Sequence, residues 1–199
     1  AALGTGVLTL NTAGVVVSST NTTGRILGNG FTIGASVTLG NASNSGALTF
    51  GGAGAITANS TVTVDSAVNW NGIVSGVGDF TKAGLGDLAL GGVNTYTGTT
   101  TVTAGKLVLN GGEAIVNTGT VTVNSPGILR LGANEEIGSL SGSGAVELSI
   151  FTLTVSGATT TGVLSGVMSG LGGFERVGTG ATTLSGANTF SGGVAIGSG

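Results

Sequence analysis

The sequence predicts an all-β protein, a right-handed parallel β-helix of about eight coils. Three observations lead to this fold class. Apolar residues alternate with Thr, Ser and Gly over short runs, Gly accounts for 42 of the 199 residues while charged residues make up only 7%, and one long motif occurs twice without a gap. Hydrophobic residues still reach 40%, which excludes ordinary disorder.

The predicted strands are short runs in which apolar side chains occupy alternate positions, the pattern of a strand with one buried face. In chain order they lie at residues 7–10, 31–33, 37–39, 48–50, 62–64, 88–90, 107–109, 121–123, 146–148 and 153–155. The Gly, Asn and Ser residues between these runs favour turns. Apolar spacings of three and four residues are nearly absent, so we expect almost no helix.

The motif that occurs twice favours a β-helix over a sandwich or a barrel. Residues 72–102 align with residues 166–196 at a constant offset of 94, and twelve of the 31 aligned positions are identical. We interpret this offset as about four coils of roughly 20 to 25 residues. We therefore expect residues 94 apart to have equivalent surroundings. The single continuous β-helix would cover residues 1–199, with repeat copies at about 72–109 and 166–199.

Composition argues against catalysis, and we expect no enzyme activity. The absence of His and Cys excludes Ser-His-Asp and Cys-His nucleophiles, zinc sites built from these ligands, and disulfides. Asp79 and Asp87 are the best candidates for an acid–base pair or a calcium ligand, but Gly173 and Ala181 replace them in the second copy. We therefore expect no catalytic residue, no metal site and no cofactor.

Charge and hydropathy also limit the partners. The net charge is −3 and the few basic residues form no cluster, so nucleic acid is not an expected partner. Polar residues or Gly interrupt every apolar run before it is long enough to span a bilayer as a helix, and we expect no transmembrane segment.

A composite pattern of Gly, aromatic, Asn and Thr residues characterises both copies. The first copy contains Gly76, Phe80, Gly84, Gly86, Leu90, Asn94, Thr95, Tyr96 and Gly98. The second contains Gly170, Phe174, Gly178, Gly180, Leu184, Asn188, Thr189, Phe190 and Gly192. This pattern resembles the autotransporter-associated β-strand repeat of bacterial autotransporter passengers and large outer-surface proteins. The resemblance implies a right-handed β-helix that is secreted to the bacterial cell surface and has no enzyme activity.

These observations together predict a structural segment of a secreted surface protein, a passenger-like stalk or fibre used for surface display, adhesion or self-association. The second copy stops where the first continues into the strand at 107–109, so we expect the chain to associate end to end. The alternative is a self-assembling extracellular filament subunit that its neighbour completes.

Two surface features bear on the partner. Trp70 has no counterpart in the second copy, where Leu164 stands, and is the candidate exposed contact for a glycan or a host surface. The recurring rings, Phe80 with Phe174 and Tyr96 with Phe190, are expected inside the coil.

Thr-x-Thr triplets begin at residues 61, 101, 120 and 152 and would suit an ice-binding face. Their spacings of 40, 19 and 32 share no coil length, which argues against a continuous lattice and makes this function the least favoured.

Overall fold

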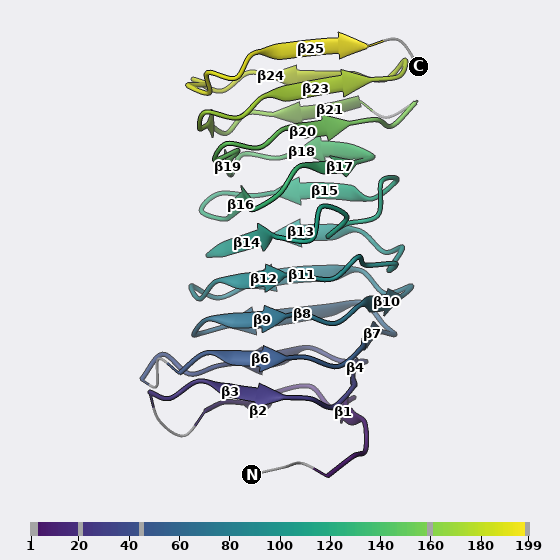
Figure 1. The fold of residues 1–199 in the computed structure, drawn as a ribbon, viewed down its shortest axis with the longest axis vertical. Coiled ribbons are helices and arrows are strands. Elements are labelled where there is room, and N and C mark those ends of the chain that lie inside the picture. The colour runs from purple at the N-terminus through teal and green to yellow at the C-terminus, as the bar shows by residue number, and fades with distance from the viewer. Residues whose placement is uncertain (1–3, 20–21, 44–45, 159–160, 198–199) are drawn as a thin grey trace.

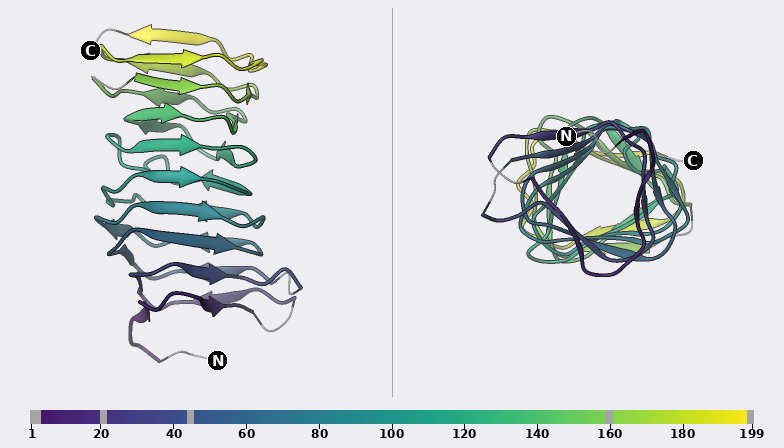
Figure 2. Two further views of the ribbon diagram at one scale, coloured as in Figure 1. Left: turned by 180° about the vertical axis from the view of Figure 1, so that it is seen from behind. Right: turned by 90° about the horizontal axis from the view of Figure 1, so that it is seen from below.

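In a computed structural model that describes residues 4–19, 22–43, 46–158 and 161–197, the chain winds as a coil of parallel strands about one axis (Figure 1). These residues form 25 strands and no helix. Each turn of the coil passes three faces, which we call faces A, B and C. Seen along the axis, the turns superimpose as a ring (Figure 2).

Face A contains β1 (Leu8–Leu10), β4 (Phe31–Ile33), β7 (Gly54–Ile56), β10 (Val74–Gly76), β17 (Glu135–Ile137), β20 (Leu153–Val155), β23 (Phe174–Val177) and β25 (Val194–Gly197). Face B contains β2 (Val15–Val17), β5 (Val37–Leu39), β8 (Ser60–Val64), β11 (Phe80–Ala83), β13 (Thr100–Val102), β15 (Thr120–Val123), β18 (Ser139–Ser141), β21 (Thr161–Leu164) and β24 (Ala181–Leu184). Face C contains β3 (Arg25–Leu27), β6 (Leu48–Phe50), β9 (Val68–Trp70), β12 (Leu88–Leu90), β14 (Lys106–Leu109), β16 (Ile128–Leu131), β19 (Ala145–Glu147) and β22 (Met168–Ser169).

The turns climb in a right-handed sense, as parallel strands joined by crossovers nearly always do. In Figure 1, β9 and β12 run from left to right at the front, and β8 and β11 return behind them while the chain rises. The coil makes about nine turns, one more than expected, and the predicted β-helix is confirmed.

Each strand pairs with the strand one turn later, most often 20 residues along the chain, as Phe80 does with Thr100. The offset ranges from 17 residues, between Ile128 and Ala145, to 25, between Val37 and Val62. Bends between strands absorb these differences, so the strands stay in register while the bends vary. All ten predicted strands lie within or overlap observed ones.

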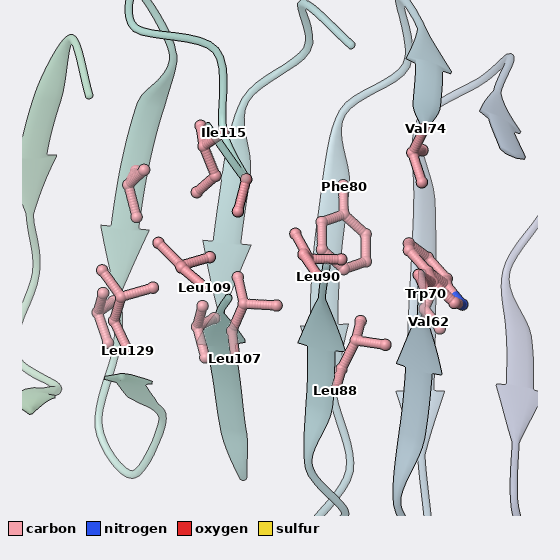
Figure 3. Close-up of a cluster of buried hydrophobic side chains, with 14 of the residues drawn as sticks. Val62, Trp70, Val74, Phe80, Leu88, Leu90, Leu107, Leu109, Ile115 and Leu129 are labelled. Carbon is pink, nitrogen blue, oxygen red and sulfur yellow. The ribbon is translucent and has the colours of Figure 1, made fainter. Parts of the chain in front are cut away.

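The core consists of the alternate side chains that point inward from all three faces. Phe50, Phe31, Trp70, Phe80 and Tyr96 form a continuous series of ring contacts, with successive centroids 5.1 to 6.4 Å apart. Figure 3 shows Trp70 and Phe80 beside aliphatic side chains that continue the core along the axis, among them Leu88, Leu90, Leu107, Leu109 and Leu129. Such burial contributes about 1.5–3 kcal/mol for each large side chain.

The two motif copies do not lie on the same face, contrary to the expected offset of about four coils. Phe80 begins β11 on face B, whereas Phe174 begins β23 on face A. Residues 88–90 form β12 on face C, and their counterparts at 182–184 lie in β24 on face B. With turns of about 20 residues, 94 residues make roughly four turns and two thirds of another. Equivalent residues of the two copies still point inward or outward alike, although the copies are displaced by one face. This is possible because each face provides a similar short strand between two bends.

Glycines stand at bends where adjacent turns approach each other closely. Gly76 has a φ of 116°, in the left-handed region, and a Cβ there would overlap the backbone of Ile56 in the preceding turn. Its counterpart Gly170 has a φ of 118° and lies against the backbone of Ser149. The recurrence of this glycine therefore has a steric cause as well as a conformational one.

We expect Gly76→Ala to lower the free energy of unfolding by about 2–4 kcal/mol, since it adds a backbone clash to the cost of positive φ. Gly14→Ala is the matched control, because Gly14 has a φ of 80° but open space at its Cβ position. Denaturant titration followed by circular dichroism would measure both variants. Equal losses in the two would show that the close approach at residue 76 contributes nothing.

Candidate functional site

The recurring Asn of the motif connects turns of the coil through its side chain. Asn94 is only 3% exposed and lies on face A where no strand forms between β10 and β17. Its Oδ1 accepts a hydrogen bond from the backbone N of Val74 at 2.8 Å, and its Nδ2 donates to the carbonyl of Ala114 at 2.8 Å. One side chain thus replaces ladder hydrogen bonds to the turn before and the turn after.

Asn188 repeats half of this arrangement on face C. Its Oδ1 accepts a hydrogen bond from the backbone N of Met168 at 2.8 Å. The residue that follows each Asn is exposed and donates its own backbone N–H to the same preceding turn, Thr95 to Val74 and Thr189 to Met168, both at 2.9 Å. The Asn-Thr pair therefore pairs with the turn beneath it in both copies.

The aromatic position after Asn-Thr completes the packing of the same turn. Tyr96 is 1% exposed, and its hydroxyl lies 2.8 Å from Oγ1 of buried Thr100. Burial raises the pKa of Tyr96 above its usual range, so the phenol stays protonated. Its counterpart Phe190 lacks the hydroxyl and packs, partly buried, against the core. The prediction that the recurring rings fill the interior is confirmed for Phe80, Phe174 and Tyr96.

Lys82 is a buried cation that sequence reasoning did not single out as structural. Its Nζ donates to the carbonyls of Ala83, Gly84 and Ala104 at 2.8–3.0 Å, which satisfies all three donors of the ammonium group. Desolvation lowers the pKa of Lys82 to about 8, against the opposing effect of Asp87 and Asp65. The sequence signal was available, because Lys82 holds an inward position two residues after Phe80.

Arg176 takes the place of Lys82 in the second copy and is 6% exposed. Its guanidinium donates to the carbonyls of Val155, Gly157 and Val177. Lys82 contacts the turn that follows it, whereas Arg176 contacts the turn that precedes it. A buried cation bound to backbone carbonyls at a bend is thus common to both copies.

Glu135 is a buried carboxylate, 3% exposed, at the start of β17. It accepts hydrogen bonds from the backbone N of Ile115 at 2.7 Å and of Ala114 at 3.2 Å. Desolvation raises the pKa of Glu135 to about 7, and the charge of Glu113 also raises it. The two backbone hydrogen bonds lower the pKa, but their effect is smaller than that of desolvation. In the sequence it is one of two adjacent glutamates before Ile137, and only strand register distinguishes the inward one.

The expectation that Trp70 is an exposed contact is wrong. Trp70 is 1% exposed and packs between Phe31 and Phe80 in the series of rings. It lacks a counterpart because the second copy of the motif lies on another face, where Leu164 belongs to β21. All eight aromatic residues lie in the described part of the chain and none is exposed, so a glycan-binding platform of exposed rings is absent there.

The candidate carboxylates are separated. Asp79 accepts hydrogen bonds from the backbone N and Oγ1 of Thr99 at 2.8 and 2.9 Å, which links two turns, while Asp87 is exposed beyond the other end of β11. Across the residues that the structure describes, His, Cys, Asp and Glu form no group of three that could hold a metal ion. The same residues include no helix long and apolar enough to cross a membrane.

Two stretches of the chain, residues 80–109 and 174–199, match the sequence model of the passenger-associated transport repeat. The chain contains autotransporter passenger repeats. This confirms the resemblance seen in the sequence, and the two matches cover most of the two motif copies. These matches indicate a protein that is secreted and displayed at the cell surface.

One curated protein adds to this assignment. Over 138 residues the chain is 36% identical to the adhesin BmaC autotransporter of Brucella suis biovar 1 (strain 1330). The aligned part is 65% of this chain and 4% of that adhesin, so the chain spans a small fraction of its relative's length. No solved structure matches the chain significantly. The recurring Asn and aromatic residues described above lie within the two matched stretches.

We expect Asn94→Ala to lower the free energy of unfolding by about 2–4 kcal/mol, because it leaves the N–H of Val74 and the carbonyl of Ala114 buried without partners. Asn188→Ala is the matched comparison in the second repeat, where the side chain is half-buried. The loss of unfolding free energy in Asn188→Ala should be smaller than in Asn94→Ala. Urea unfolding of both variants would measure the difference, and a larger loss in Asn188→Ala would contradict the role given to Asn94.

Proposed function

We propose that this chain is a non-enzymatic, rigid stalk segment of a surface-displayed passenger that carries surfaces for adhesion or self-association. The observation that supports this most directly is the passenger repeat folded into stacked turns. About nine turns at a spacing of ~4.8 Å form a rod roughly 43 Å long. The buried polar groups of both repeats connect turn to turn, so their role is to hold the rod together.

For the 199-residue chain on its own, we propose self-association end to end. The turn containing β24 and β25 has half-buried inward side chains, such as Leu184 and Phe190, and exposed Val194 and Ile196. At the other end Leu8, Val15 and Val17 are also only partly buried. Both ends carry apolar edges of parallel strands, and stacking of one copy's first turn on another's last turn would continue the coil.

A solution of the chain should therefore form head-to-tail oligomers whose weight-average mass rises with concentration. Ile196→Lys adds a charge at the end surface and should shift the distribution toward monomer in sedimentation velocity. Val163→Lys is the control, because Val163 is exposed on the side of the rod in β21. A wild-type chain that stays monomeric at high concentration would contradict end-to-end association while leaving the stalk itself intact.

A second candidate function arises from the threonines of face B. Outward side chains one turn apart form a row along this face. Its members Thr61, Thr81, Thr101, Thr122 and Ser141 are paired in register, and Ser36 accepts a hydrogen bond from the backbone N of Thr61. A second row contains Thr38, Thr63, Ala83 and Thr103. Three of the four Thr-x-Thr triplets thus share one face, contrary to the interpretation of their spacings, because 40 residues are two turns with Thr81 between them. The triplet at residue 152 lies on face A.

Most members of these rows are Thr, which presents both a hydroxyl and a methyl group, and neighbouring positions lie about 4.8 Å apart along the axis and roughly 6.6 Å apart along each strand. The rows carry little charge, and we propose ordered water, at an ice surface, as their ligand. Thermal hysteresis of the wild-type chain is the expected result. Thr101→Lys should abolish it, whereas Thr154→Lys on face A should not. Absence of hysteresis in the wild type would remove this candidate and leave the stalk proposal untouched.

A further inference from the structure

Residues 110–119, between the end of β14 and the start of β15, are the second of two successive passages of face A that form no strand, after residues 91–99. No strand forms there, yet Ala114 and Ile115 are completely buried. Their backbone occupies the position of a strand between the turn that contains Asn94 and the turn that contains Glu135. Side chains at this level of the rod therefore supply hydrogen bonds that a regular strand ladder would otherwise make.

Two side chains hold this segment from opposite sides. Asn94 donates to the carbonyl of Ala114 from the preceding turn at 2.8 Å, and the backbone N of Asn94 donates to the carbonyl of Glu113 at 2.9 Å. From the following turn, Glu135 accepts the N–H groups of Ala114 and Ile115 at 3.2 and 2.7 Å. The segment is thus held by a neutral amide on one side and by an ionisable acid on the other.

None of the five Lys and Arg side chains, all of which lie in the described residues, forms an ion pair with Glu135. In the described chain, the two ion pairs join Lys106 and Arg130 to Glu147, and Lys82 and Arg176 are bound to carbonyls. Two titratable groups act on Glu135. Glu113 is exposed and lies on the segment 110–119, and Tyr96 is buried and lies on the turn that precedes this segment. An ionised Glu135 is therefore a buried charge stabilised by two backbone N–H groups alone and opposed by another carboxylate.

We propose that Glu135 locks a proton-sensitive joint in the rod, so that residues 110–119 are held in the coil more firmly when Glu135 is protonated than when it is ionised. The direction follows from linkage. Burial raises the pKa of Glu135 to about 7 from an ordinary value of 4.5, so the closed joint binds the proton more tightly than an open one. The stabilisation is complete below pH 4.5 and is lost as the pH rises through 7. The rod is then stiffest at this level in mildly acidic surroundings.

Hydrogen exchange of the full chain, read by mass spectrometry and corrected for intrinsic exchange rates, would test the joint. Between about pH 5.5 and about pH 8, protection of residues 110–119 should fall by roughly tenfold or more, as the two pKa values require. Protection of β8 and β9, in other turns, should not change. A uniform loss of protection in every turn would overturn the proposal.

Glu135→Gln removes the titrating group and should make the protection of residues 110–119 independent of pH. Glu136→Gln is the matched control, because Glu136 is the next residue of β17 and points outward. It should retain the wild-type dependence, and a dependence that survives in Glu135→Gln would overturn the proposal.

Nuclear magnetic resonance of the wild type keeps the test independent of whether a variant folds. The amide signals of Ala114 and Ile115, which donate to the carboxylate, should titrate with a midpoint near 7. A midpoint near 4.5 would show that the buried acid behaves as an exposed one and would overturn the proposal.

Discussion

Backbone hydrogen bonding from each turn to the next is the constraint on which the whole structure depends. A parallel coil has no other way to satisfy the N–H and C=O groups of its strands, so the register between neighbouring turns is fixed wherever a strand forms. Since side chains alternate along a strand, a fixed register also fixes which residues point inward. Apolar residues therefore stack on apolar residues, as Leu88 does on Leu107, and threonines stack on threonines, as Thr81 does on Thr101.

The same constraint explains the buried polar side chains. Where the chain leaves the strand conformation, its backbone groups lose their ladder partners, and a side chain from an adjacent turn supplies the missing donor or acceptor. Asn94 and Glu135 do this around Ala114, and Lys82 binds carbonyls at the bend after β11. Replacing such a group by an apolar residue would leave the backbone buried and unpaired, which costs more than the lost hydrogen bond itself.

Sequence reasoning recovered what depends on local pattern. Alternation in runs such as 48–50 and 121–123 identified strands and their buried side, because a buried face requires it. It could not recover what depends on the exact number of residues per turn. The bends vary in length, so neither the face occupied by Phe174 nor the common face of the threonine triplets followed from spacing. Trp70 was misplaced for the same reason, since lack of a counterpart 94 residues away says nothing about exposure when the copies lie on different faces.

A division between inside and outside follows from comparing the two repeats. Several positions that agree, such as Phe80 with Phe174 and Asn94 with Asn188, are inward and bind the turns together. Some positions that differ lie outside or at bends, where Asp79 and Asp87 give way to Gly173 and Ala181. The fold sets no requirement on outward residues beyond compatibility with a strand, so they can change without loss of the rod. Outward side chains that differ between the copies can therefore give a passenger specificity for a partner without changing the buried groups, such as Phe80 and Asn94, that hold the turns together.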